Sequence, residues 1–333
     1  MRSIIKHTHE QLKILQSRDL QGKIQLTIAR IMEWYEHYGG NVYISFSGGK
    51  DSTVLLDLAR RAYPDIKAVF SDTGLEYPEV REFAKAQSNV DVVRPKTTFR
   101  QILERYGYPV ISKEVAKHIF YYRKGSQFAK DCFNGVNKDG TPSEFRQRYK
   151  KYKYLTEASF SIAPHCCKYI KIQPLQQYER ETKRKPIIAT MACESQQREA
   201  GWYKTGCNSF KNGRSQPMSF WTEQDVLMYL NKTGIPYASV YGEIINLDSQ
   251  LTLYEDDLDP LACTGCERTG CMFCCYGINH DRVPNRFQRM KLTHPKIYEY
   301  CIGGGEYDST GMLKPNKKGL GIGKILDYIG VPY

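Results

Sequence analysis

Apolar side chains along the first hundred residues switch between helical spacing and short strand-like runs. Residues 1–40 show mostly helical spacing, and the Gly39-Gly40 pair ends that stretch. The expected strands lie at 42–46, 67–71, 90–93 and 186–191, and the expected helices between the first three at 53–59 and 78–87. Strands that alternate with helices predict an α/β fold, with an open, mostly parallel sheet and helices on both faces.

The same pattern divides the chain into three predicted parts: an N-terminal helical segment at 1–40, an α/β domain at 41–260, and a cysteine-rich segment at 261–333. Residues 113–154 interrupt the alternation and predict an insertion or lid. This stretch holds eleven Lys and Arg against four Asp and Glu, a net charge of +7, with nine aromatic residues interleaved. Two interpretations stay open: a solvated helical surface over buried aromatics, or a surface for single-stranded nucleic acid.

Net charge and cysteine content narrow the range of expected partners, location and cofactors. The net charge of +12 favours a polyanionic partner, although solubility alone also explains it. No run of about 18 apolar residues and no signal-peptide stretch is visible, so we expect a cytosolic chain with no membrane partner. Eleven cysteines are then better explained by metal binding or redox chemistry than by disulfides, and five of them lie between Cys263 and Cys275.

A glycine loop, Ser47-Gly48-Gly49-Lys50-Asp51-Ser52, follows the first expected strand and opens a helix. Its glycines allow a tight turn whose N–H groups face phosphate oxygens, and the helix N-terminus adds positive dipole character. Lys50 adds a full charge and the serines add hydroxyl groups. The loop is not a Walker A motif, because Asp51 follows the lysine and Ile44 stands where that motif needs glycine. It predicts an anion site at the carboxyl end of a strand.

This loop resembles the pyrophosphate loop of the N-type ATP pyrophosphatases, and residues 71–79 (Ser-Asp-Thr-Gly-Leu-Glu-Tyr-Pro-Glu) resemble the second-strand motif of the phosphoadenosine phosphosulfate reductase branch. The resemblance covers roughly residues 40–300 and implies an adenine nucleotide alpha-hydrolase-like fold that binds ATP with Mg²⁺. It implies catalytic roles for Lys50, Asp51 and Arg198. The implied nucleotide-binding residues are Ser45, Ser47, Gly48, Gly49, Lys50, Asp51, Ser52, Asp72, Thr73, Gly74, Ser195 and Arg198. Lys113 also resembles a family position near the site.

The cysteines resemble a second family feature. Residues 165–175, which contain the adjacent Cys166 and Cys167, resemble the segment that binds a 4Fe–4S cluster in adenylyl-sulfate reductases together with a later Cys-x-x-Cys pair. The resemblance favours Cys271 and Cys274 as that pair, with Cys207, Cys263 and Cys266 as alternatives. Two alternatives to the cluster stay open. One is a zinc site at Cys263, Cys266, Cys271 and Cys274, which are spaced C-x₂-C-x₄-C-x₂-C, and the other is that the cysteines are free thiols.

The resemblance leaves three activities. The leading hypothesis is cleavage of ATP to AMP and pyrophosphate, adenylating an acceptor for sulfur transfer, with tRNA or DNA as a candidate acceptor and a cysteine desulfurase as a candidate sulfur donor. The second is reduction of adenylyl sulfate or its 3′-phosphorylated form. That reaction needs a mobile cysteine in a Glu-Cys-Gly-Leu-His segment near the C-terminus, and the neighbours of Cys301 do not match it. The third is a nucleotide-sensing module with a structural metal site.

Overall fold

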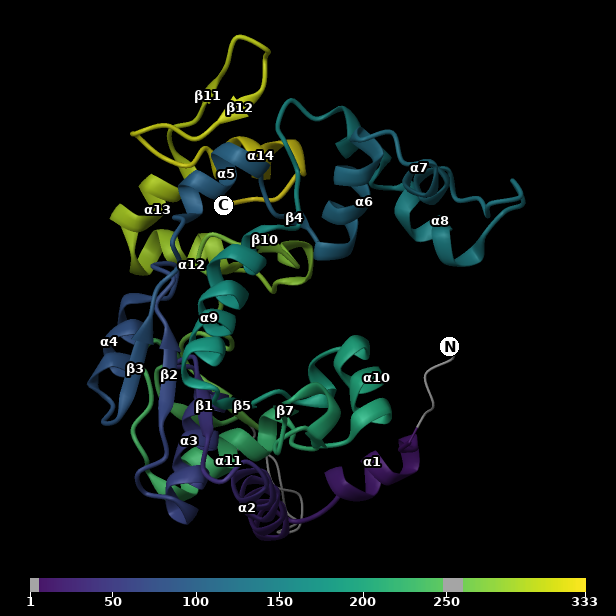
Figure 1. Ribbon diagram of the computed structural model, residues 1–333. Helices are drawn as coiled ribbons and strands as arrows, with labels where there is room; N and C mark the ends of the chain where they lie inside the picture. The colour runs from purple at the N-terminus through teal and green to yellow at the C-terminus, as the bar shows by residue number, and fades with distance from the viewer. Residues whose placement is uncertain (1–5, 248–259) are drawn as a thin grey trace. The chain divides into compact units, whose positions relative to one another are not determined.

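The computed structural model describes residues 6–247 and 260–333, which form two compact units (Figure 1). Each unit is built from two separate stretches of chain. The first unit runs up to Arg94 and again from Pro174 to Thr269, and the second unit contains Pro95–Gln173 and Gly270–Tyr333. None of the helices in the described ranges has the length and apolar character needed to cross a bilayer.

The first unit carries the sheet and the helices around it. Its strands are β1 Val42–Phe46, β2 Ala68–Ser71, β3 Val90–Val93, β5 Lys185–Ile188, β6 Asn208–Ser209, β7 Arg214–Ser215, β8 Ile244–Asn246 and β9 Leu261–Cys263. Its helices are α1 His9–Gln16, α2 Leu20–His37, α3 Lys50–Ala62, α4 Pro78–Ala86, α9 Gln173–Thr182, α10 Gln196–Thr205 and α11 Glu223–Thr233, with short 3₁₀ turns at Ala192–Glu194, Phe210–Asn212 and Ser239–Tyr241. The α/β fold class predicted from the sequence is confirmed.

Six strands form one sheet in the order β3-β2-β1-β5-β7-β6. All neighbours are parallel except β6, which runs antiparallel to β7. The central strand β1 pairs with β2 on one side and with β5, about 140 residues later in the sequence, on the other. The carboxyl ends of β1, β2 and β5 therefore meet at one edge, which is where ligands bind in open α/β sheets.

The alternating side chains of β1 show why both faces of this sheet are covered. Val42, Ile44 and Phe46 point into the main core, which α2, α3 and α11 close with side chains such as Trp34, Leu55 and Trp221. Tyr43 points to the opposite face, where it packs with Val69 and with Tyr178 of α9. Because a strand buried on both faces can carry apolar residues at successive positions, the run Val-Tyr-Ile is compatible with a central strand.

The second unit is mainly helical. Its helices are α5 Phe99–Tyr106, α6 Lys113–Arg123, α7 Gln127–Asn134, α8 Glu144–Lys150, α12 Arg286–Thr293, α13 Pro295–Ile302 and α14 Ile322–Tyr328, with 3₁₀ turns at Lys153–Glu157 and Ile278–His280 and a π-helical turn at Lys168–Ile172. Its strands are β4 Val110–Ile111, β10 Cys275–Tyr276, β11 Glu306–Tyr307 and β12 Leu313–Lys314. β4 pairs parallel with β10, and β11 pairs antiparallel with β12.

The structure groups residues differently from the three predicted segments. Helices α1 and α2 of the predicted segment 1–40 belong to the first unit with the sheet. The basic stretch 113–154, predicted as an insertion, forms α6, α7 and α8 and belongs to the second unit together with most of the predicted cysteine-rich segment. Part of the predicted domain 41–260, residues 248–259, lies outside the described residues.

Candidate functional site

The predicted anion loop lies between β1 and α3 at the carboxyl edge of the sheet. Gly48 has a φ of 74°. A Cβ atom there would lie 2.7 Å from the carbonyl oxygen of Val80 in α4, so close packing as well as backbone conformation requires glycine. Gly49 precedes the first turn of α3 without a side-chain cap. The N-terminal dipole of this thirteen-residue helix therefore points into the loop.

Hydroxyl groups hold the N–H groups of this loop. The Ser47 N–H donates to Ser52 Oγ at 3.2 Å, and the Gly49 N–H donates to Ser47 Oγ at 3.3 Å. The Lys50 N–H donates to the Tyr241 hydroxyl at 3.2 Å. Tyr241 is buried and its hydroxyl lies 2.5 Å from Thr269 Oγ1. Neutral hydroxyl acceptors therefore satisfy three N–H groups of the loop in this structure.

Lys50 is a buried cation at this edge of the sheet. Its side chain is 4% exposed, and its Nζ lies 3.1 Å from Glu223 and 3.8 Å from Asp51. Burial alone would lower the pKa of Lys50, but the carboxylates of Asp51 and Glu223 outweigh it and raise the pKa. Lys50 therefore keeps a full positive charge in a largely dry position, where electrostatic interactions are strongest.

Asp51 has a buried oxygen with an unmet hydrogen-bonding capacity. Its Oδ1 has no hydrogen-bond partner among the described residues. Burial raises the pKa of Asp51, although the nearby charges of Lys50 and Arg268 oppose that rise. Ser71 Oγ, at the end of the neighbouring strand β2, is a second buried polar atom without a partner in the described part of the chain. Such orphaned atoms need an explanation, and a bound ligand or cation is one.

The predicted residue Asp72 is placed beside this loop but is engaged by cations. It is 3% exposed, it accepts two hydrogen bonds from Arg81 at 2.8 and 2.9 Å, and Lys85 Nζ lies 2.8 Å away. Burial would raise the pKa of Asp72, but the hydrogen bonds from Arg81 and Lys85 outweigh it and lower the pKa to about 2. In this structure the carboxylate therefore anchors α4 to the end of β2. Its predicted contact with a nucleotide stays a prediction.

Thr73 and Gly74 form the turn that follows Asp72. Thr73 donates from its N–H and its hydroxyl to Glu76, and Gly74 has a φ of 73°. Both predicted residues thus belong to a turn fixed by its own side chains. Ser45, also predicted, lies within β1 and pairs with Val69 and Ile188.

Ser195 and Arg198 lie at the start of α10. Ser195 caps this helix, since its hydroxyl accepts the N–H of Arg198 at 3.3 Å. The Arg198 guanidinium pairs with Glu194 and interacts electrostatically with Asp51 and Arg268. Arg198 thus lies within electrostatic range of Asp51 in the loop, and the hydroxyl of Ser195 has a structural role as a helix cap. The predicted contacts of both residues with a nucleotide stay predictions.

Sequence reasoning missed several side chains at this site. Residues 221–226 predict only the start of a helix, with Thr222 as its N-cap and Asp225 as the reciprocal partner, so sequence reasoning did not assign Glu223 to the site. Tyr241 and Arg268 carry no motif. Cys193 was not singled out either. It is the exposed thiol among the eleven cysteines, all of which are described, and it interacts electrostatically with Arg268 and Asp51. Burial of part of its side chain raises the pKa of Cys193. None of these residues is near the loop in sequence, so only the fold brings them there.

The four favoured cysteine ligands all belong to the second unit. Cys166 and Cys167 precede the π-helical turn, and their sulfur atoms are 3.9 Å apart. The sulfur of Cys166 also interacts electrostatically with Cys274 and Cys271. The hydrogen bond from Cys166, with help from Lys171 and Lys113, lowers the pKa of Cys167 to about 6. Burial raises the pKa of Cys274 to about 11.

The alternative cysteines belong to the first unit. Cys263 ends β9 and interacts electrostatically with Lys50, and Cys266 is buried. Cys207 accepts a hydrogen bond from Ser219 at 3.3 Å and lines a cavity of about 390 Å³. Over residues 6–247 and 260–333, no three His, Cys, Asp or Glu side chains are gathered so that they could hold a metal ion. The predicted iron–sulfur and zinc sites both stay predictions.

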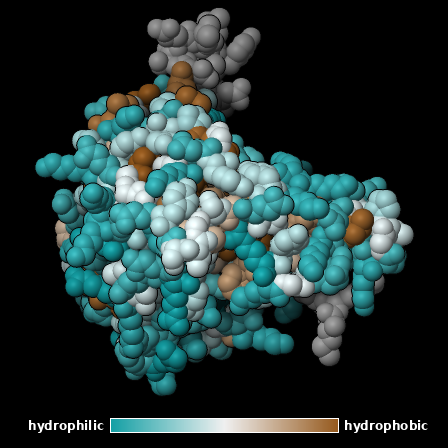
Figure 2. Space-filling view, turned by 90° about the horizontal axis from the view of Figure 1, so that it is seen from above, coloured by the Kyte–Doolittle hydropathy of each residue, from teal (hydrophilic) through white to brown (hydrophobic). Residues whose placement is uncertain are grey.

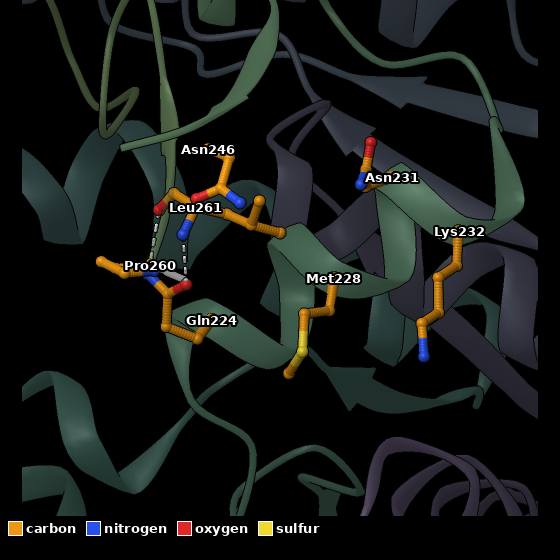
Figure 3. A pocket seen from close by; sticks show the side chains of 7 residues that line it. All are labelled: Gln224, Met228, Asn231, Lys232, Asn246, Pro260 and Leu261. Atoms are coloured by element: carbon orange, nitrogen blue, oxygen red, sulfur yellow. Dashed lines mark hydrogen bonds between the residues drawn. The ribbon is translucent and has the colours of Figure 1, made fainter. Parts of the chain in front are cut away.

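A second cavity of about 380 Å³ lies beside α11 in the first unit (Figure 3). Gln224 closes one wall, since its side-chain amide exchanges two hydrogen bonds with the backbone of Leu261, at 2.8 and 3.0 Å. Met228 and Lys232 continue this wall along α11. None of the loop residues 47–52 lines this cavity, so it is separate from the candidate site.

The sheet and the loop together define the class of open, parallel α/β proteins whose ligand loop follows a central strand. The chain belongs to the phosphoadenosine phosphosulfate reductase domain family. The family model matches residues 41–130 and 134–276, which include the loop, Asp72, Arg198 and all four favoured cysteines. The resemblance seen in the sequence motifs is therefore confirmed at the level of the family.

Three relatives are similar to this chain at 22–26% identity. An uncharacterised protein of Methanocaldococcus jannaschii is 25% identical over 283 residues, which are 83% of this chain and 51% of that protein. An adenosine 5′-phosphosulfate reductase of Lysinibacillus sphaericus is 22% identical over 64% of this chain and 73% of its own. Subunit 2 of a sulfate adenylyltransferase of Shewanella frigidimarina is 26% identical over 67% of this chain and 68% of its own. The chain spans about half the length of the first relative, and the two named relatives are enzymes.

Proposed function

We propose that this chain binds ATP at residues 47–52 and cleaves it between the α and β phosphates, adenylating an acceptor. The observation that carries the proposal is the buried, charged Lys50 at the carboxyl end of β1. A relative named as a sulfate adenylyltransferase subunit supports it, because that name describes adenylyl transfer.

The residues of this chain supply charge and orientation for the reaction. The acceptor oxygen forms a bond to the α phosphorus, the bond from the α phosphorus to the bridging oxygen breaks, and pyrophosphate leaves with the electron pair. Lys50 and the N-terminus of α3 stabilise the charge that develops on pyrophosphate. Arg198 interacts electrostatically with Asp51 of the loop, and we propose that its guanidinium stabilises the phosphoryl oxygens that remain with AMP.

The carboxylates beside Lys50 fit a divalent cation. Asp51 Oδ1 is buried without a hydrogen-bond donor in the described chain, and a hard oxygen ligand of this kind suits Mg²⁺. When bound, Mg²⁺ would neutralise charge on the phosphates. Asp51 would hold it, and Glu223 is the second carboxylate within reach of Lys50.

Sulfur transfer is the second stage of the proposal. A thiol reductant would release hydrosulfide from a persulfide on a donor protein and would leave as a disulfide. The hydrosulfide would form a bond to the acceptor atom while the bond from that atom to the adenylated oxygen breaks, and AMP would leave with that oxygen and the electron pair. Cys166, Cys167, Cys271 and Cys274 would hold a 4Fe–4S cluster, because they supply four thiols in one unit and two lysines favour the thiolate of Cys167. Two observations support this set of ligands. All four side chains are thiols, and Cys166 interacts electrostatically with the other three.

Reduction of adenylyl sulfate is the second candidate, favoured by the names of several relatives. Such a reaction needs an accessible thiol. Cys301 is fully buried in α13, and burial raises its pKa well above the ordinary range, so it is a poor candidate. Cys193, exposed beside Asp51 and Arg268, is the thiol that this alternative would use.

One assay separates the two candidates. With ATP, Mg²⁺ and candidate acceptors, we expect the wild-type chain to release pyrophosphate, and we expect Cys193→Ser to release it at a similar rate. With adenylyl sulfate and a dithiol reductant, we expect no sulfite from either. Sulfite formation by the wild type that Cys193→Ser abolishes would establish the reductase instead. Tight ATP binding without pyrophosphate release would favour a nucleotide-sensing module.

Metal analysis tests the cysteine assignment separately. After anaerobic purification we expect roughly four irons and four sulfides per chain, as a 4Fe–4S cluster requires, and a loss of most iron in Cys271→Ser. Cys132→Ala is the matched control, because Cys132 is a buried thiol of α7 in the same unit and outside the predicted set. A colourless wild-type chain with one zinc, or equal iron loss in the control, would contradict the cluster.

A further inference from the structure

The basic stretch 113–154 forms a small helical cluster with its own core in the second unit. α7 contacts both α6 and α8. Phe133 and Tyr149 are buried in this cluster, and Tyr149 packs edge-on against the buried His118 with ring centroids 4.9 Å apart. These rings match the interpretation that the aromatics of this stretch lie under a solvated surface.

Four other aromatic side chains of the same stretch stay largely exposed to solvent, although each has a neighbouring ring. Phe145 is 62% exposed and Phe128 is 57% exposed, with Tyr121 at 46% and Tyr154 at 43%. Burying a phenylalanine side chain stabilises a fold by roughly 1.5–3 kcal/mol. Two phenylalanine rings left mostly in water therefore contribute little to the stability of this fold. Figure 2 shows the surface of α7 and α8, at its right, as largely hydrophilic with a small hydrophobic patch.

Each exposed phenylalanine is stacked with an arginine. The Arg148 guanidinium lies 3.8 Å from the ring centroid of Phe145, and that of Arg146 lies 4.8 Å from the ring centroid of Phe128. Both guanidinium groups are fixed. Arg148 donates to the Tyr149 hydroxyl at 2.7 Å and pairs with Glu114, and Arg146 donates to the carbonyl of Val136. Rings and guanidinium planes held in this way are the surfaces on which unpaired bases stack.

The charges of the cluster leave a net cationic surface. Three of the four carboxylates are engaged locally: Glu114 by Arg148 and Tyr149, Asp131 by Gln127, and Asp139 by Thr141. Of the eight lysines in this stretch, only Lys153 makes a side-chain hydrogen bond with the described residues, to Asn134. The ammonium groups of Lys124 and Lys151 lie over the rings of Phe120 and Tyr152. The ammonium groups without a hydrogen bond, ion pair or ring contact among the described residues are those of Lys113, Lys117, Lys130, Lys138 and Lys150. The excess positive charge is therefore available to an external anion.

We infer that the α6–α8 surface binds single-stranded nucleic acid, with phosphates paired to its free lysines and bases stacked on Phe128 and Phe145. Free lysines beside exposed phenylalanines that stack with arginines favour this partner. An acidic protein or an anionic membrane would pair with the lysines but would make no use of the two rings. The inference rests on the α6–α8 cluster alone and goes beyond the proposed function. It identifies a surface that would hold a nucleic-acid acceptor.

Fluorescence anisotropy with 5′-labelled 20-nucleotide oligo-dT and oligo-U tests the inference without ATP. We expect both to bind, with affinity falling roughly 50-fold between 50 and 200 mM salt if about four phosphates are contacted. The double variant Phe128→Ala/Phe145→Ala should weaken binding by at least about 10-fold, because each stacked base contributes roughly 1–3 kcal/mol. A preference for one oligonucleotide would identify RNA or DNA as the natural strand.

Two further variants make the test specific. Tyr307→Ala is the matched control, since Tyr307 is 55% exposed and lies 5.1 Å from a lysine in the same unit but outside the α6–α8 surface. The triple variant Lys117→Gln/Lys138→Gln/Lys150→Gln removes three positive charges and should reduce the slope of log affinity against log salt by about 2, at roughly 0.7 per phosphate contact. Equal binding by the double variant and Tyr307→Ala, equal affinity for a duplex of the same length, or binding only to anionic lipid vesicles would overturn the inference.

Discussion

Replacing Lys50 with methionine will lower ATP-dependent pyrophosphate release by about 100-fold or more, as expected when a preorganised charge aimed at a leaving group is removed. The side chain is 4% exposed and lies between Glu223 and Asp51, so the variant loses the positive charge that faces the departing pyrophosphate and keeps two negative ones. Steady-state pyrophosphate release with saturating ATP and Mg²⁺ measures the effect, and a circular dichroism spectrum checks that the variant folds.

Lys67→Met is the matched control for this experiment. Lys67 also pairs with one carboxylate, Asp91 at 3.2 Å, but it precedes β2 at the amino edge of the same sheet. We expect this variant to retain nearly full activity, because a pair of this exposure contributes about 0–1 kcal/mol and touches no loop residue. Equal activity of Lys50→Met and Lys67→Met would show that the loop is not the site of ATP cleavage.

Replacing Asp225 with alanine will lower the free energy of unfolding by about 3–5 kcal/mol, the usual cost of leaving one partner of a buried ion pair alone. Lys23 of α2 lies 2.7 Å from both oxygens of Asp225 in α11, and both side chains are 4% exposed. Asp225 also accepts the N–H of the N-cap residue Thr222 at 2.7 Å, which is the reciprocal bond of the capping box of α11. One substitution therefore leaves a buried ammonium group without its partner and removes one of the two capping-box bonds.

Urea unfolding followed by tryptophan fluorescence measures this loss. Arg30→Ala is the control, because Arg30 lies in the same helix as Lys23 and pairs with Glu33 at 3.0 Å, but both side chains are more than 40% exposed. We expect this exposed pair to contribute about 0.2–1 kcal/mol. A loss below about 1 kcal/mol in Asp225→Ala would mean that water reaches the pair in solution.

Local patterns were sufficient to predict the elements around the loop. The strand at 42–46 and the strand at 90–93 have the predicted bounds, and the helix expected at 78–87 is observed at Pro78–Ala86. The N-cap of α11 by Thr222, with Asp225 as reciprocal partner, is confirmed. These features depend on side chains three or four residues apart, or on apolar runs, and both are visible in one sequence. The strand expected at 186–191 is observed at Lys185–Ile188 and is therefore shorter. The chain leaves the sheet after Ile188 and continues to the 3₁₀ turn at Ala192–Glu194.

The composition of the site could be predicted only in part. The loop itself carries a motif, but Glu223, Tyr241 and Cys193 reach it through strand order and helix packing. Asp72 does carry a motif, but the motif did not give its contacts. The motif predicts that Asp72 contacts a ligand, whereas in the structure Arg81 and Lys85 of the next helix bind its carboxylate. The partners of a charged group are fixed by the fold, so a motif can locate such a residue without giving its contacts.

Because each unit is built from two separate stretches of chain, the residues of the candidate site are synthesised in two stages. The loop at 47–52 is made early, but the Tyr241 hydroxyl that holds it is added 191 residues later. At about 5–20 residues per second, this interval lasts roughly 10–40 s. For most of that time the nascent chain has β1 without its neighbour β5, because β5 ends at Ile188. The intervening residues 95–173, which belong to the second unit, are made before β5. Synthesis of the second stretch of the first unit, rather than of the loop, therefore sets the moment at which the site is complete.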